Sequence, residues 1–135
     1  MTLKKFIPKN IRKSIDRYED SAWIANSKPA WENEQIAVYQ DLFPVTPGHL
    51  LFVPKKNDIA HIQIAYSTAY EHGQKEIKEG RWHGFNIGQN VGLAAGQTVL
   101  WPHVHLIPRM EGDLEPGKVN GIRLSHPNGD HKVHY

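Results

Sequence analysis

Apolar positions along the chain either alternate with polar ones or form short runs, a pattern that predicts several strands. The strand-like segments are Ala22–Ala25, Gln35–Gln40, His49–Val53, Trp82–Ile87 and Thr98–Ile107. Each has the length and the bounding turn residues of a strand in a half-buried sheet. Between the second and the third segment, Pro44, Pro47 and Gly48 break any helix and predict a turn.

Helical spacing is found in two places. The longer pattern runs over Ile64–Glu79, where Ala65, Ala69, His72 and Ile77 form a weak inner stripe. A shorter one covers Asn10–Glu19, with Asn10 as a plausible N-cap. Several strands with one main helix and a short N-terminal helix predict an α+β fold with an antiparallel sheet.

Composition narrows the class of protein. A chain of 135 residues with 39% hydrophobic and 22% charged residues is typical of one globular domain, which we expect to span residues 1–135. The formal net charge is only +2, and acidic residues follow the basic N-terminal cluster at once. We therefore expect no binding of duplex nucleic acid.

The sequence contains no cysteine, which excludes disulfides, thiolate metal sites and a cysteine nucleophile. No apolar run approaches the roughly 20 residues that a membrane span needs. The basic N-terminus is interrupted by Pro8 and lacks the apolar core of a signal peptide. We expect a cytoplasmic protein without membrane contact.

The segment from Gly96 to Arg109 carries the most informative chemistry. If it is a strand, Trp101, His103 and His105 share one face, while Pro102, Val104 and Leu106 point to the other. Two adjacent imidazoles are unusual in a core because their nitrogens need partners. From this motif alone, a metal site completed by His49 and His61, or two surface histidines, both remain open.

Three blocks in order resemble the histidine-triad superfamily, in particular its diadenosine polyphosphate hydrolase-like branch. The blocks are Asp41–His49 followed by Pro54-Lys55, then Gly84–Gly92, and then Ala95–Val99 with His103-Val104-His105-Leu106-Ile107-Pro108-Arg109. The resemblance covers about Trp23 to Arg123. One position departs from it, because Trp101 stands where the family has the first histidine of its triad, and Pro102 follows.

In the family, the backbone carbonyl of that first residue orients the central histidine, and a carbonyl survives the change to Trp101. The resemblance then implies that His103 attacks the α-phosphorus of a nucleotide or dinucleotide, forming a nucleotidyl-histidine intermediate. His105 would assist the leaving group, and His49 would support His103. Trp101 itself is expected to fill space under the site.

Substrate contacts are implied in the same way. Asp41 would accept hydrogen bonds from the ribose, although an ordinary turn role before Pro44 is an alternative. Asn90, Gln97 and Thr98 would bind phosphate oxygens or the leaving group, although loop side chains often cap backbone groups instead. Leu42 and Tyr39 would border the base. We expect no metal ion and no other cofactor.

Rival functions are phosphoramidate cleavage, a nucleotide-binding module with little turnover, and a metal-dependent enzyme built on His103, His105 and His49. Family members commonly pair, so we expect a homodimer. The remaining histidines match no family site, but His131 and His134 could meet a substrate bound by a neighbouring subunit. Arg109 and Lys55 follow prolines at strand ends and are left out of the catalytic set.

Overall fold

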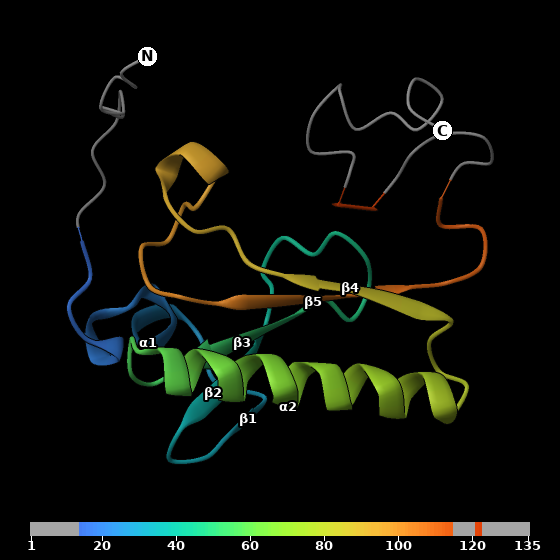
Figure 1. The fold of residues 1–135 in the computed structure, drawn as a ribbon, viewed down its shortest axis with the longest axis horizontal. Coiled ribbons are helices and arrows are strands. Elements are labelled where there is room, and N and C mark those ends of the chain that lie inside the picture. The colour runs from blue at the N-terminus through green and yellow to red at the C-terminus, as the bar shows by residue number, and fades with distance from the viewer. Residues whose placement is uncertain (1–13, 115–120, 123–135) are drawn as a thin grey trace.

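The computed structural model describes residues 14–114 and 121–122, and its centre is a five-stranded antiparallel sheet with the order β1-β2-β3-β5-β4 (Figure 1). The strands are β1 (Trp31–Glu32), β2 (Ile36–Gln40), β3 (Leu50–Pro54), β4 (Gly84–Gly88) and β5 (Val104–Arg109). The helices are α1 (Ala22–Asn26) and α2 (Ile59–Lys78), with single 3-10 turns at η1 (Tyr18–Asp20) and η2 (Leu93–Ala95). The expected α+β fold with one main helix is confirmed.

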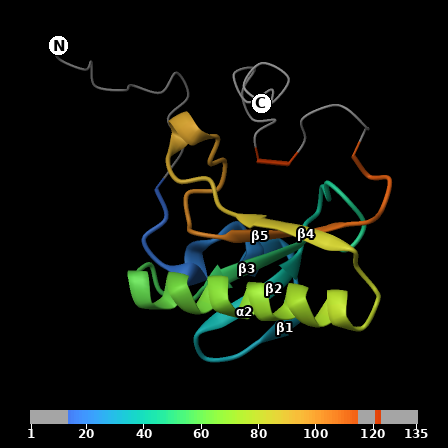
Figure 2. The same cartoon turned by 45° about the vertical axis from the view of Figure 1, so that its right-hand side comes forward.

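The sheet is covered on both faces where β2 and β3 pass through its middle. Ile36, Val38 and Phe52 pack on one face with α2, whereas Ala37 and Tyr39 face the other way. That second face is covered by Tyr18, Trp23 and Trp101 from the segments before β1 and before β5. Figure 2 shows α2 on one side of the sheet and α1 on the other. The functional histidines described below belong to the α1 side.

Helix α2 begins earlier than its apolar stripe suggested, because Asp58 caps it. The Asp58 carboxylate accepts a hydrogen bond from the His61 backbone N–H at 2.8 Å. The buried stripe consists of Ala65, Ala69 and Gly73, while His72 and Ile77 are only partly buried. Within the described residues, no helix combines the length and the apolar character needed to cross a membrane.

Gly73 allows α2 to approach β4 closely. A Cβ atom at this position would lie 2.5 Å from the Phe85 ring. Gly73→Val should therefore destabilise the protein by about 1–3 kcal/mol through overpacking, with a shift in the urea midpoint and little change in slope. Glu71→Val, on the exposed side of the same helix, is the matched control. Equal losses from both variants would show that valine's helix propensity, and not the Phe85 contact, decides the effect.

The N-terminal elements differ from the prediction. The segment Ala22–Ala25 is helical and belongs to α1, not to a strand. A short apolar run is ambiguous between the two, and Trp23 faces the core in either case. Of the helix expected over Asn10–Glu19, residues 10–13 lie outside the described part, and only the 3-10 turn η1 forms at its end.

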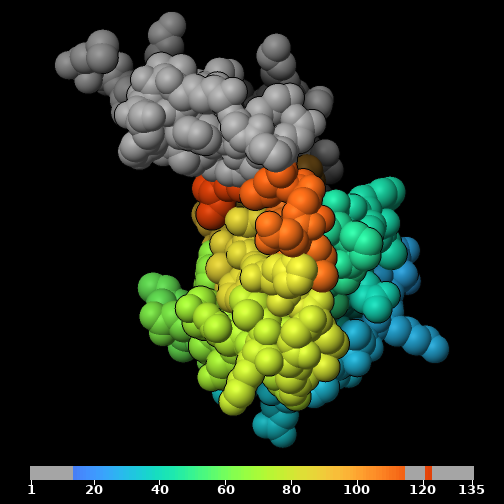
Figure 3. Space-filling view, turned by 90° about the vertical axis from the view of Figure 1, so that its right-hand side faces the viewer, coloured from blue at the N-terminus to red at the C-terminus, as the bar shows by residue number. Residues whose placement is uncertain are grey.

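The loop from β2 to β3 folds back against the end of β5. The Thr46 hydroxyl donates to the Pro108 carbonyl at 2.7 Å, and Gly48 takes a positive φ of 90° that favours glycine. Figure 3 shows this loop, in teal, beside the orange residues that follow β5. The loop thereby holds Asp41 at its beginning and His49 at its end near β5.

Candidate active site

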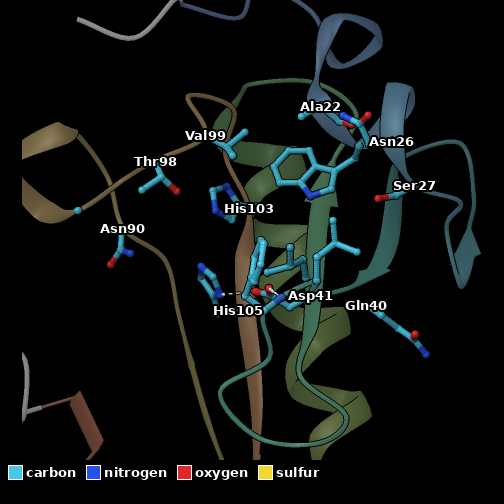
Figure 4. A pocket seen from close by; sticks show the side chains of 15 residues that line it. Ala22, Asn26, Ser27, Gln40, Asp41, Asn90, Thr98, Val99, His103 and His105 are labelled. Atoms are coloured by element: carbon cyan, nitrogen blue, oxygen red, sulfur yellow. Dashed lines mark hydrogen bonds and ion pairs between the residues drawn. The ribbon is translucent and has the colours of Figure 1, made fainter. Parts of the chain in front are cut away.

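A cavity of about 320 Å³ lies on the α1 side of the sheet. Five parts of the chain line it: α1 and its end, the end of β2 with the start of the loop that follows, Leu51 of β3, the glycine-rich loop before β5, and His103 with His105. In Figure 4, His103 and His105 lie side by side, with Asn90 and Thr98 to one side and Ala22, Asn26 and Ser27 to the other. The fold therefore brings the two histidines into the lining of this cavity.

The strand that carries the histidines is shorter than the predicted Thr98–Ile107. It begins at Val104, where Phe52 is the pairing partner, so His103 lies just before β5 and His105 within it opposite Leu51. Pro102 has no N–H to donate to a neighbouring strand, and pairing stops there. The face assignment still holds, since His103 and His105 have ring centroids 5.1 Å apart and Val104 and Leu106 pack on the α2 side.

His103 is oriented by the backbone of Trp101. Its Nδ1–H donates to the Trp101 carbonyl at 2.7 Å, and the edge of its ring contacts Trp23, with ring centroids 5.0 Å apart. Because Nδ1 carries the proton, Nε2 keeps a free lone pair. Burial lowers the pKa of His103, against the raising effects of the Trp101 carbonyl and of Asp41. The side chain is thus neutral at neutral pH and holds an oriented lone pair on Nε2.

Trp101 is locked in place beneath the site. Its indole Nε1–H donates to the Pro54 carbonyl at 2.7 Å, and the residue is 2% exposed. It belongs to the core cluster of Tyr39 and Val53 and does not line the cavity. Trp101 therefore fills space, as expected. Its own buried side chain fixes the position of its backbone carbonyl.

His49 and His105 form a second, complementary pair. The Val45 N–H donates to His49 Nδ1 at 3.1 Å, so the proton of neutral His49 is on Nε2. That nitrogen lies 2.9 Å from His105 Nδ1, which must then accept, leaving the His105 proton on Nε2. Burial, and next the neighbouring His103 and His49, lower the pKa of His105 to about 4. His105 is therefore a neutral N–H donor beside the His103 lone pair.

Asp41 serves both the loop and the histidines. One carboxylate oxygen accepts from the Phe43 N–H at 2.8 Å, which is the turn role that the sequence left open. The other oxygen lies 3.4 Å from His49 Nε2 and 3.9 Å from His105 Nδ1. Asp41 also lines the cavity, with 16% of its side chain exposed. The same carboxylate can therefore accept a hydrogen bond from a ligand hydroxyl while it faces the two histidines.

A metal alternative also has a geometric basis in this cluster. Donor atoms of Asp41, His49 and His105 all lie within 4.8 Å of one another. Two imidazole nitrogens on one tetrahedral zinc lie about 3.3 Å apart, whereas the His49 and His105 nitrogens are 2.9 Å apart. The observed spacing is that of a hydrogen bond, and a metal ion would have to open it. His103, which the metal hypothesis included, is not part of this group.

Other predicted contact residues divide into two sets. Leu42, Thr98 and Asn90 line the cavity. Tyr39 does not: the alternation of β2 turns it into the core, where its ring stacks on Trp23 with centroids 6.1 Å apart and its hydroxyl bonds Tyr18. Gln97 does not either, since its amide accepts from the Gly92 N–H at 2.8 Å and donates to the Val99 carbonyl at 2.9 Å. These contacts are those of a loop side chain that caps backbone groups, the alternative that the sequence left open.

Sequence reasoning missed Trp23 and Phe43 as cavity residues. Trp23 was assigned to a strand, although Ser21 directly before Ala22 is a residue type that often precedes a helix. Phe43 is 88% exposed beside the cavity, and an exposed aromatic side chain is a signal that only the structure reveals. His131 and His134 lie outside the described residues.

Three histidines, of which His49 and His103 are buried and His105 is partly buried, make stability depend on pH. Burial is the first cause that lowers the pKa of His49, His103 and His105. Each folded-state pKa lies below the unfolded value of about 6.5, so the unfolded chain takes up protons first. The free energy of unfolding should be highest above pH 6.5 and fall as the pH is lowered, for His105 down to about 4.

Urea denaturation at a series of pH values measures this effect. In His105→Asn, the decrease between pH 6.5 and 4 should be smaller, because one proton-binding site is lost. The same pH dependence in the variant and in the wild-type protein would contradict the assignment.

Comparison with known proteins adds to this geometry. The family model of the HIT domain matches residues 25–112. An uncharacterized HIT-like protein of Methanocaldococcus jannaschii is 31% identical over 103 residues, which cover 72% of this chain and 80% of that protein. An AP-4-A phosphorylase of Mycobacterium tuberculosis is 37% identical over 83 residues, 54% of this chain but only 42% of the phosphorylase.

Among solved structures, a zinc-bound histidine triad family protein from Mycobacterium smegmatis superimposes with a TM-score of 0.60 at 29% identity. The match covers 68% of this chain and 74% of that protein. The five-stranded sheet and the main helix are thus shared with an experimentally determined histidine-triad structure.

Proposed function

The chain belongs to the HIT domain family, and we propose that it cleaves dinucleoside polyphosphates or related nucleotide conjugates at the α-phosphate. The intermediate is a nucleotidyl group on His103. The observation that carries this proposal is the set of hydrogen bonds that assigns opposite tautomers to His103 and His105. The Trp101 carbonyl leaves a lone pair on His103 Nε2, and His49 leaves a proton on His105 Nε2.

The reaction has two displacements. In the first, the His103 Nε2 lone pair forms a bond to the α-phosphorus, and the bond from that phosphorus to the leaving oxygen breaks with its electrons. His105 Nε2–H donates a hydrogen bond to this oxygen as its negative charge grows. In the second, water attacks the phosphorus, the P–N bond breaks, and a nucleoside monophosphate is released with one proton.

Substrate contacts follow from the lining of the cavity. Asp41 accepts from ribose hydroxyls, and Leu42 with Trp23 borders the base. Asn90 and Thr98 bind phosphate oxygens, together with the N–H groups of the glycine-rich loop. Gln97 acts indirectly in this scheme, because its amide ties Gly92 to Val99 and shapes that loop.

The testing experiment is product analysis of the purified protein with diadenosine tri- and tetraphosphate and with an adenosine phosphoramidate. Each reaction is run with and without a chelator. Release of AMP that resists the chelator supports the proposal, and the preferred substrate distinguishes hydrolysis of dinucleotides from cleavage of phosphoramidates. Loss of activity with the chelator would instead support a metal ion at Asp41, His49 and His105.

Nucleotide binding without any product would overturn the enzymatic proposal and leave a binding module. The similarity to the AP-4-A phosphorylase supports nucleotide chemistry in general. It does not select a substrate, because the matched region is less than half of that enzyme. The choice among these substrates therefore depends on the product analysis.

We also propose that the protein forms a homodimer in the cytoplasm. Strand β4 is at one end of the sheet order, and an end strand has one row of backbone groups free to pair with a second copy. Light scattering during size-exclusion chromatography should give twice the mass of the chain, and a monomer mass would overturn the proposal.

A further inference from the structure

A second cavity, of about 180 Å³, lies next to the candidate active site. Gln97, Leu100 and Pro102 line it, whereas Thr98, Val99 and His103 line the first cavity. The segment before β5 therefore lies between the two and contributes side chains to each. Asn90 lines both cavities. The two cavities thus adjoin at Asn90.

The position of Asn90 gives the second cavity its place relative to the chemistry. In Figure 4, Asn90 lies on the opposite side of His103 and His105 from Asn26 and Ser27. A nucleotide whose ribose reaches Asp41 and whose α-phosphate meets His103 therefore has its expelled part directed toward Asn90. Each in-line displacement places the leaving oxygen opposite the attacking nitrogen, and a leaving group that extends toward Asn90 reaches the second cavity, because Asn90 lines both.

The lining of the second cavity indicates the kind of group it can hold. Amide side chains of Asn57, Gln89 and Asn90 occur there with apolar Leu100 and Pro102, and no lining side chain is charged. The Gln89 Oε1 atom is buried and has no hydrogen-bond partner among the residues that the structure describes. A buried unpaired acceptor calls for a donor such as a ligand N–H or O–H. The volume exceeds the roughly 150 Å³ of a cavity known to hold one aromatic ring.

We propose that this cavity is a subsite for the leaving group, which holds its uncharged ring, a nucleobase or sugar that donates an N–H or O–H to Gln89. The proposal rests on the proposed function. It identifies the preferred substrates as conjugates whose leaving group ends in such a ring, ahead of those that expel only ammonia or a small amine.

Three substrates separate the sources of the ring. Diadenosine diphosphate expels AMP, ADP-ribose expels ribose phosphate, and adenosine phosphoramidate expels ammonia. Diadenosine tri- and tetraphosphate then vary the distance between the α-phosphorus and the second adenosine. If the base is bound, kcat/KM for the dinucleotides exceeds that for ADP-ribose; if only the sugar is bound, the values are similar and both exceed that for the phosphoramidate.

Two variants test the cavity itself. Gln89→Met keeps the length of the side chain but removes the acceptor, and should lower the ratio of kcat/KM for the best ring-bearing substrate to that for the phosphoramidate about tenfold. Val91→Trp should lower the same ratio by filling the cavity, because Val91 lines it and is 68% exposed. Ile59→Trp adds the same side chain at a residue that is 74% exposed and lines neither cavity; it is the matched control and should keep the ratio within about twofold.

The outcomes distinguish this inference from the proposed function. Turnover of all substrates with ratios that neither Gln89→Met nor Val91→Trp alters would overturn the subsite and leave the proposed function intact. No turnover of any substrate would overturn the proposed function. In that case, the affinity for diadenosine tetraphosphate relative to AMP tests the subsite. If the ring is bound there, Gln89→Met and Val91→Trp must both lower this relative affinity.

Discussion

His103→Ala should lower kcat for nucleotide cleavage by at least about a thousandfold, with a much smaller effect on substrate affinity. Removing a covalent nucleophile typically reduces kcat by several orders of magnitude because no other group can form the intermediate. His103 Nε2 has this role in our account, since Nδ1 is bonded to the Trp101 carbonyl. Steady-state kinetics on the preferred substrate measure the loss.

Two further variants separate chemistry from structure. His103→Asn keeps an N–H that can donate to the Trp101 carbonyl but has no imidazole nitrogen, so it should fold like the wild-type protein and be as inactive as alanine. His83→Ala removes an exposed histidine that does not line the cavity and should retain activity. If His103→Asn kept more than about a tenth of the wild-type kcat, His103 would not be the nucleophile.

Trp101→Ala should cause the largest loss of stability, about 3–5 kcal/mol, the range for truncation of a buried tryptophan. Trp101 is 2% exposed and packs in one core cluster with Tyr39 and Val53. Its removal also leaves the Pro54 carbonyl without the indole donor. Urea denaturation measures the loss, and Trp31→Ala, at a tryptophan that is 49% exposed, is the matched control.

Trp101→Phe tests the link between this core residue and catalysis. Phenylalanine keeps an aromatic ring but not the Nε1–H, so the loss of stability should be smaller, about 1–3 kcal/mol. The Trp101 backbone is then less firmly held, and kcat should decrease more than KM increases, because the carbonyl orients the nucleophile. A stable Trp101→Phe variant with wild-type kcat would show that the indole bond to Pro54 does not contribute to this orientation.

The fold could be predicted where one pattern determined an element. The strands β2, β3 and β4 and helix α2 follow from alternation, turn residues and helical spacing. The prediction failed where long-range packing decides. β1 has only two residues, and exists because Trp31 pairs with Val38, while Thr98–His103 leaves the strand because Pro102 stops pairing and Trp101 enters the core.

The candidate site was predictable to a similar degree. The three histidines and Asp41 came from a resemblance in sequence blocks, and the structure brings them together. Tyr39 was expected to border the base but lies in the core. Alternation alone does not tell which face of β2 is covered by another layer. Trp23 provides that layer, from a helix that apolar spacing over five residues could not distinguish from a strand.

The most direct test of a nucleotidyl-His103 intermediate is the stereochemical course at the α-phosphorus. A dinucleotide with a chiral α-phosphorothioate is cleaved by the wild-type protein in water enriched in ¹⁸O, and the configuration of the labelled product is determined by NMR. Two displacements predict overall retention of configuration. Inversion would mean that water attacks the α-phosphorus directly, and would contradict the role of His103 as nucleophile.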